Sequence, residues 1–155
     1  MANVKKIINR VFKINILFLI VAIIFPLKSY ALELGNQGPG GGIVFYVNNS
    51  GSHGLEAKAA DEGRVFGWTF IGANFVWTEA LSVAKAYGSG WHLPTKDELD
   101  LLFQQQTVVG GFANVYYWSS TEVDNNSGWS QGFGTGNQSD DNKANSFRVR
   151  AVRAF

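Results

Sequence analysis

Two histidines are the first residues in this sequence whose chemistry suits catalysis or metal binding. His53 and His92 lie 39 residues apart, and neither belongs to a pair spaced to put two imidazoles on one helix face. His53 lies in the tetrapeptide Gly51–Gly54, where we expect its ring to hold a turn through a hydrogen bond. The spacing does not indicate a zinc site, and we predict no metal.

Nucleophilic catalysis has little support in the sequence. The chain contains no cysteine, which excludes thiolate catalysis, thiolate metal sites and disulfide bonds. Serines are numerous, but none lies in the glycine pattern of a nucleophile elbow. We therefore predict a protein that is not an enzyme and that uses no cofactor. A serine or carboxylate mechanism stays open as the alternative.

Residues 122–146 form the most unusual stretch, because polar residues dominate it and large aromatic residues interrupt it. We predict a long loop that carries the function, since loops of this length inside a compact domain are functional or disordered. Trp129 stands among amides and hydroxyls, which suits stacking on a sugar ring or on a protein side chain. The interpretation that Trp129 packs the loop onto the body stays equally open. The candidate ligand-binding residues are Trp129, Asn125, Asn126, Gln131, Asp124, Asp140, Asp141 and Asn142.

Part of this set also offers the hard oxygen atoms that calcium prefers. Asp140, Asp141 and Asn142 are consecutive, however, and their spacing matches no calcium-binding loop. Calcium-dependent sugar-binding loops are built around a proline, but the prolines that follow the N-terminal segment, Pro39 and Pro94, both lie outside residues 122–146. We interpret the acidic and amide residues as solvated turn residues.

The N-terminal residues predict export. Basic residues precede an almost wholly apolar run, Ile14–Leu27, and Ser29 and Ala31 then offer the small side chains that a signal peptidase accepts. A membrane-spanning helix needs about 20 apolar residues, so the run is short for a permanent anchor. We expect residues 1–31 to be a cleaved signal peptide. Residues 32–155 then form a secreted protein of the periplasm, cell surface or medium, which does not span a membrane.

Cleavage changes the net charge of the protein. The full chain has 13 basic and 12 acidic residues, and five of the basic residues but none of the acidic ones precede residue 32. The remaining 8 basic and 12 acidic residues give a net charge of −4. Nucleic-acid binding depends on a basic face, so we predict no nucleic-acid partner. The length suits a single domain.

The first half of this domain combines one strand with two helices. Ile43–Val47 is a β-branched and aromatic run typical of a buried strand, and Gly35–Gly40 before it is predicted to be a flexible lead-in. Apolar residues recur at helical spacing over residues 78–87, where Thr78 is the expected N-cap. A second helix begins at Thr95, because Thr95 and Glu98 form a capping box, and it ends at residues 104–106.

The second half predicts strands, so the fold class is α+β. The expected strands are residues 115–120, 129–133 and 147–155. In the last of these, alternation puts Arg148 and Arg150 on the face opposite Phe147, with a bulge near Ala151.

Five sequence blocks carry a resemblance to a known family: Gly38–Val47, His53–Ala57, Gly90–Leu99, Tyr117–Glu122 and Val149–Arg153. In this order they resemble the bacterial DUF1566 family, which includes the C-terminal domain of the Legionella collagen-like adhesin. Family members commonly have arginine where His92 stands. The resemblance implies a C-type-lectin-like fold with two helices, a small antiparallel sheet and long loops. The same fold occurs in formylglycine-generating enzymes and in receptor-binding proteins.

The sequence thus predicts an exported, non-enzymatic binding module that recognises a glycan or a protein through residues 122–146. Two alternatives stay open. One is an exported enzyme or enzyme-accessory domain related to the formylglycine-generating fold, and the other is a structural component of the cell envelope. Fold alone does not decide between them.

Overall fold

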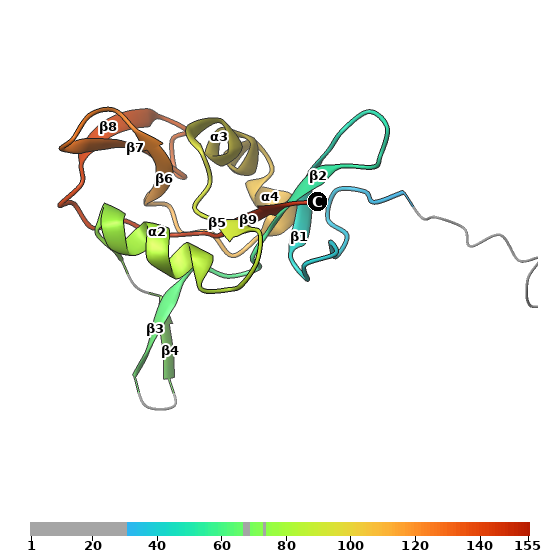
Figure 1. The fold of residues 1–155 in the computed structure, drawn as a ribbon, viewed down its shortest axis with the longest axis horizontal. Coiled ribbons are helices and arrows are strands. Elements are labelled where there is room, and N and C mark those ends of the chain that lie inside the picture. The colour runs from blue at the N-terminus through green and yellow to red at the C-terminus, as the bar shows by residue number, and fades with distance from the viewer. Residues whose placement is uncertain (1–30, 67–68, 73) are drawn as a thin grey trace, which may run out of the picture. The chain divides into compact units, whose positions relative to one another are not determined.

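The computed structural model describes residues 31–66, 69–72 and 74–155. The predicted signal peptide, except for Ala31, lies outside these residues. Helices and small antiparallel sheets make up the described part, so the predicted α+β class is confirmed (Figure 1). None of the described helices combines the length and the apolar character needed to cross a membrane.

A four-stranded antiparallel sheet joins distant parts of the chain. Its strand order is β1-β2-β9-β5, and its strands are β1 (Ile43–Val47), β2 (Gly54–Ala57), β9 (Val152–Ala154) and β5 (Trp91–His92). The C-terminal strand β9 lies between β2 and β5 and therefore closes the domain. The predicted strand at residues 43–47 is confirmed, although an irregularity between Val44 and Tyr46 leaves Tyr46 exposed.

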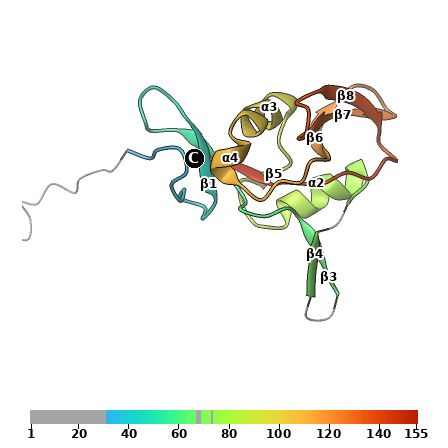
Figure 2. The same ribbon diagram turned by 180° about the vertical axis from the view of Figure 1, so that it is seen from behind.

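Two further sheets complete the described strands. The hairpin of β3 (Gly63–Phe66) and β4 (Thr69–Gly72) forms a sheet of its own. The other sheet has the order β6-β7-β8, with β6 (Tyr116–Glu122), β7 (Ser127–Gly132) and β8 (Gln138–Asn142). Both views show β6-β7-β8 together at one end of the domain, beside the larger helices (Figures 1 and 2).

Strand β6 separates two hydrophobic cores, because its neighbouring side chains point to opposite faces. Trp118 is fully buried in a core with Trp77 of α2 (Trp77–Lys85) and Trp91 of β5. Tyr117 is fully buried in the other core, together with residues of α3 (Lys96–Gln104) and the short α4 (Gln106–Val109). A strand buried on both faces explains the continuous aromatic run in the sequence.

Helix α2 begins earlier than its sequence predicts. Its N-cap is Val76, which makes no side-chain capping bond, so the predicted cap at Thr78 is wrong. Trp77 fixes this start, because it is buried and its indole Nε1 donates to the backbone oxygen of Ser119 at 2.8 Å. Tertiary packing here outweighs local capping. Gly88, with a φ of +115°, follows the helix where the sequence predicts its end.

Helix α3 begins where the sequence predicts. Thr95 is its N-cap, and the Thr95 hydroxyl accepts from the backbone N–H of Glu98 at 3.2 Å. The Glu98 carboxylate accepts from the Thr95 backbone N–H at 2.8 Å, so the capping box is complete. The capping box thereby fixes where α3 begins, with Lys96 as its first residue.

The glycine-rich segment before β1 is ordered, so the prediction of a flexible lead-in is wrong. The buried carboxylate of Glu56 accepts from the backbone N–H groups of Gly40 at 2.7 Å and Gly42 at 2.8 Å. A β-carbon at Gly38 would lie 2.6 Å from the same carboxylate, and one at Gly42 would lie 2.7 Å from the backbone oxygen of Ala57. Close approach to the buried acid therefore requires glycine at position 38, and close approach to the backbone of β2 requires it at position 42.

The predicted strand at residues 147–155 forms only in part. Phe147 and Arg148 make isolated bridges to Phe75 and Tyr117, and regular pairing is confined to β9. Val149 and Ala151 belong to the same core as Phe147, whereas Arg150 lies against Phe112 of the other core, as the predicted alternation requires. The face that carries Arg150 is nevertheless buried, since Arg150 is 1 % exposed.

Candidate functional site

Residues 122–146 contain the two paired strands β7 and β8, so the prediction of one long loop is wrong, whereas the strand expected at residues 129–133 is confirmed as part of β7. Strand β7 pairs with both β6 and β8, and Trp129 of β7 lies opposite Asp140 of β8. The sequence hides β8, since its residues are all polar and give no apolar alternation. Irregular structure is confined to two turns, at residues 123–126 and 133–137, and to the segment after β8.

Trp129 is half-buried, and a lysine lies directly over it. The Nζ atom of Lys96 is 3.1 Å from the centre of the Trp129 ring, which is a cation–π contact. Lys96 is held there by its backbone, whose N–H donates to the Thr121 hydroxyl at 2.9 Å. Its backbone oxygen accepts from the Gln138 side chain at 3.1 Å. Sequence reasoning missed Lys96, although the capping box placed it at the start of α3.

Gln131 does not lie on the surface with Trp129, which corrects its expected place among exposed ligand-binding residues. It is fully buried, and its amide nitrogen donates to Asp100 at 2.9 Å and to the backbone oxygen of Gly136 at 3.2 Å. Its amide oxygen accepts from Gln138 at 3.3 Å. The side chain points in the same direction as Trp129 but lies under helix α3. Its hydrogen bonds hold the helix onto the sheet.

The turn between β6 and β7 presents Asn125 and Asn126 to solvent. The exposed carboxylate of Asp124 organises the turn by accepting from the backbone N–H groups of Asn126 and Ser127, both at 2.7 Å. These two hydrogen bonds lower the pKa of Asp124 below its ordinary value. Asp124 is therefore bonded within the turn, whereas the two asparagine side chains extend from a fixed backbone.

The acidic residues of β8 point to different faces of the sheet. Asp140 is exposed beside Trp129, and Asp141 accepts from the Ser130 hydroxyl at 2.5 Å on the opposite face. The Asn142 side chain accepts from the backbone N–H of Ala144 at 2.9 Å and so ends the strand. The structure therefore brings Trp129 and Asp140 together with Lys96, and it leaves Asp141 and Asn142 in turn and strand contacts.

The histidines have separate local roles. The His53 ring contacts the Ser52 hydroxyl at 2.9 Å within an exposed turn, as the sequence predicts. His92 Nε2 lies 3.1 Å from the Glu98 carboxylate, and His92 Nδ1 lies 3.0 Å from the backbone oxygen of Gly90. The hydrogen bond to Glu98 raises the pKa of His92 above its ordinary value. In the described residues, no three His, Asp or Glu side chains gather as metal ligands would.

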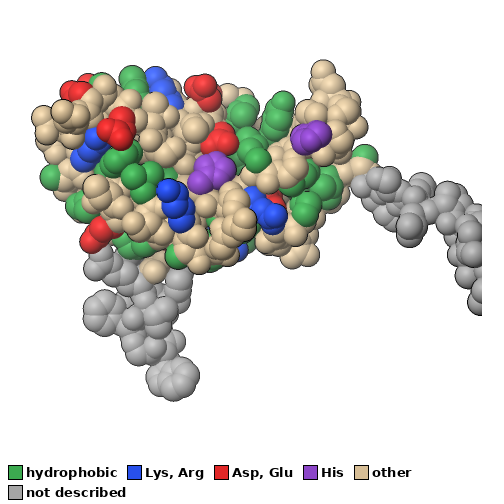
Figure 3. Space-filling view, viewed as in Figure 1, with side chains coloured by type: hydrophobic (Ala, Val, Ile, Leu, Met, Phe, Trp, Pro, Cys, Tyr) green, Lys and Arg blue, Asp and Glu red, His purple; other side chains and the backbone are tan. Residues whose placement is uncertain are grey.

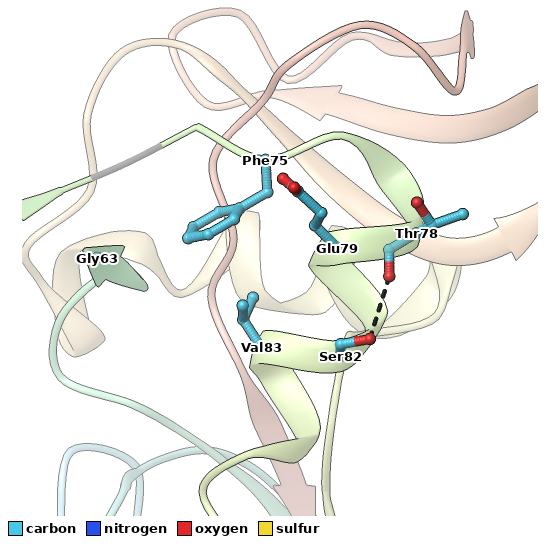
Figure 4. Close-up of a pocket in the computed structure, with 6 residues that line it drawn as sticks. All are labelled: Gly63, Phe75, Thr78, Glu79, Ser82 and Val83. Atoms are coloured by element: carbon cyan, nitrogen blue, oxygen red, sulfur yellow. Dashed lines mark hydrogen bonds between the residues drawn. The ribbon is translucent and has the colours of Figure 1, made fainter.

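A second candidate surface lies along α2. A cavity of about 650 Å³ is lined by Gly63, Phe75, Thr78, Glu79, Ser82 and Val83. Figure 4 shows Phe75 and Val83 on one side of it, and Ser82, whose hydroxyl donates to the backbone oxygen of Thr78 at 3.3 Å, on the helix. The described lining combines apolar and hydroxyl groups with the Glu79 carboxylate, which suits weak binding of an amphipathic group. None of these described lining residues is a lysine or arginine, whereas Lys96 lies over Trp129.

Charged side chains are dispersed over the face of the domain that Figure 3 shows. Acidic and basic residues alternate across it, and basic residues do not gather into one stripe there (Figure 3). No basic stripe on this face therefore competes as a binding site. Compared with the cavity along α2, the cluster of Trp129, Lys96 and Asp140, with the adjacent turn at residues 123–126, is the better candidate site, because it combines an aromatic ring with charges of both signs. We call this cluster and turn the Trp129 surface.

Comparison with known proteins gave one family. Residues 53–153, more than half of the chain, match the Lcl C-terminal domain. No curated protein matched the sequence. The matched region runs from the His53 turn to β9, and it includes both larger helices and the whole β6-β7-β8 sheet.

Proposed function

Because the chain belongs to the Lcl C-terminal domain family, we propose that it is an exported, non-enzymatic binding module of the adhesin type. The Trp129 surface recognises a glycan or a protein outside the cell. The C-type-lectin-like fold is part of the same proposal. It is supported by the order of the elements, in which two helices lie between strands that join the ends of the domain.

The observation that carries the proposal is the position of Trp129. Its half-buried ring lies against the ammonium of Lys96. The exposed Asp140 lies opposite it on β8, and the turn with two exposed asparagines leads into the same strand β7. An aromatic ring surrounded by polar groups of both charges is the composition of a binding hot spot. The ring gives contact area, while the amides and charges give direction to hydrogen bonds.

The test is replacement of Trp129 by alanine in the exported protein, with Tyr46→Ala as the control. Tyr46 is 41 % exposed on β1, in another sheet, so its removal deletes a comparable aromatic area away from the proposed surface. Capture by an array of defined glycans and by intact host cells is measured beside the melting temperature. We expect Trp129→Ala to lose about 2 kcal/mol or more of binding free energy. Tyr46→Ala should bind as the parent does.

Three outcomes contradict the proposal. A Trp129→Ala variant that melts far below the parent identifies Trp129 as a packing residue. A variant that melts and binds like the parent moves the site elsewhere. A parent protein that captures neither glycans nor cells removes the proposed function altogether.

A further inference from the structure

Lys143 lies beneath the turn of the Trp129 surface and is bound to it by both backbone and side chain. Its backbone N–H donates to the backbone oxygen of Asn126 at 2.8 Å, and its backbone oxygen accepts from the N–H of Trp77 at 3.1 Å. The residue thus joins the β6–β7 turn to the first residue of α2. The side chain returns toward the turn and is 15 % exposed.

The Lys143 ammonium is surrounded by oxygen atoms of this turn. Its Nζ donates to the Glu122 carboxylate at 2.7 Å, to the backbone oxygen of Asp124 at 2.7 Å and to that of Asn125 at 3.3 Å. Three acceptors match the three N–H donors of an ammonium. One carboxylate and two carbonyl oxygens that converge on a cation are also the donor set that hard metal ions use. Here the position of the cation is filled by a side chain of the protein.

An aromatic ring also lies near the Lys143 ammonium. We call this ring and the three oxygen atoms around Nζ the cage. Nζ of Lys143 lies 4.6 Å from the centre of the Trp77 ring, and Trp77 is buried. Trp77 packs so closely on β7 that a β-carbon at Gly128 would lie 2.9 Å from its indole nitrogen. The base of the cage is therefore fixed to the sheet, and Lys143 transmits that rigidity to the turn above.

Other lysines of the domain do not share this arrangement. Lys58 and Lys96 also lie over aromatic rings. Among the residues that the structure describes, however, only Lys143 of these three donates from its ammonium to oxygen atoms. Burial of an ammonium is costly unless charge-assisted hydrogen bonds satisfy it, so the three bonds define one geometry of the turn.

We propose that Lys143 is a positioning residue that takes the place of a metal ion beneath the turn at residues 123–126 and fixes Asn125 and Asn126 for ligand binding. The inference rests on the proposed function of the Trp129 surface. It adds that capture is independent of divalent cations. It also adds that loss of the Lys143 charge weakens capture through disorder of the turn.

The test compares three variants of the exported protein. Lys143→Met keeps the apolar stem and removes the charge, while Lys143→Arg keeps a cation that can donate to several oxygens. Lys85→Met is the matched control, because Lys85 is exposed in the last turn of α2, away from the turn. Capture by the glycan array and by host cells is measured with and without EDTA. Hydrogen–deuterium exchange of residues 123–127 and of β9 is measured in parallel.

We expect Lys143→Met to weaken capture about tenfold or more, the effect of losing one charge-assisted hydrogen bond. Exchange at residues 123–127 should rise by about the same factor, while exchange in β9 stays at the parent rate. Lys143→Arg should restore most of the capture, and Lys85→Met should match the parent. EDTA should leave capture by the parent unchanged.

Four results decide against the inference. Equal capture by Lys143→Met and the parent overturns it while the proposed function stands, provided that Trp129→Ala loses capture. Faster exchange in β9 as well as in the turn shows that Lys143 stabilises the whole domain and does not act on the turn specifically. Loss of parent capture in EDTA shows that a metal ion is needed after all. A parent that captures neither array glycans nor cells overturns the proposed function and this inference with it.

Discussion

Replacement of Arg150 by methionine tests the buried charge that holds the residue 110–113 segment. The guanidinium donates from Nε to Asp61 at 2.9 Å and lies with Nη2 2.7 Å from the same carboxylate. Its remaining N–H groups donate to the backbone oxygens of Lys58 at 2.9 Å, Gly110 at 3.1 Å and Gly111 at 2.7 Å. The Arg150 side chain is fully buried in this contact.

The expected loss follows from what methionine leaves behind. Asp61 is 10 % exposed and keeps the neutral Tyr117 hydroxyl, which donates to it at 2.7 Å. Removal of one partner from a buried ion pair costs about 3–5 kcal/mol, because the other charge stays buried without compensation. Loss of the stacking contact on Phe112, at 3.8 Å, adds to this cost. We therefore expect Arg150→Met to lower the free energy of unfolding by about 3–5 kcal/mol.

Urea unfolding followed by tryptophan fluorescence measures this loss, with Arg148→Met as the control. Arg148 is on the same segment but only half-buried, so its replacement should cost about 1 kcal/mol or less. The double variant Arg150→Met with Asp61→Asn should recover part of the stability, since the uncompensated carboxylate is gone. A loss below about 1 kcal/mol for Arg150→Met, or a double variant no more stable than the single one, refutes the reasoning.

Two further predictions concern the start of α3. Thr95→Ala removes the N-cap acceptor and should lower the free energy of unfolding by about 1 kcal/mol, measured by the same urea titration; an unchanged value would contradict the capping role. The pKa of His92 is raised above 6.5, first by its hydrogen bond to Glu98, so its stabilising effect is complete below pH 6.5 and is lost as the pH rises through the folded-state value. The melting temperature of His92→Gln should therefore fall below that of the parent at pH 5.5 and approach it at pH 8.5, and a constant difference would exclude this linkage.

Features set by neighbouring residues could be predicted from the sequence. The capping box depends on two residues three positions apart, and Thr95 and Glu98 form it as expected. The strand at Ile43–Val47 follows from a run of β-branched and aromatic residues. The strand expected at residues 115–120 is likewise found as part of β6.

Features set by distant partners could not be predicted. Arg150 alternates with apolar residues and so looks solvent-exposed, but its partner Asp61 lies 89 residues earlier and draws it inward. The Glu56 carboxylate orders Gly40 and Gly42, which in isolation have the composition of a flexible segment. Neither pairing leaves a periodic signal in the sequence.

The β6-β7-β8 sheet shows the same limit at the candidate site. Strand β8 is made entirely of polar residues, since one of its faces is exposed and the other makes polar contacts such as that between Asp141 and Ser130. Its register on β7, not its composition, places Asp140 opposite Trp129. Trp129 was therefore predicted as a candidate for a sound compositional reason, and in the strand expected at residues 129–133, but its pairing with a second, polar strand was not predicted.

Cation–π pairs join distant segments of this domain, which has no disulfide bonds. Lys58 lies over Trp91, Lys96 over Trp129 and Lys143 over Trp77, so each pair joins segments that are more than 30 residues apart. Each contact contributes about 0.5–2 kcal/mol, depending on how far the cation is desolvated. The pair on the Trp129 surface also bears on the proposed binding role. One face of the ring is occupied by Lys96, so a ligand would stack on that face only by displacing the ammonium. A ligand that instead contacts Asp140, which lies opposite Trp129 on β8, would avoid that cost.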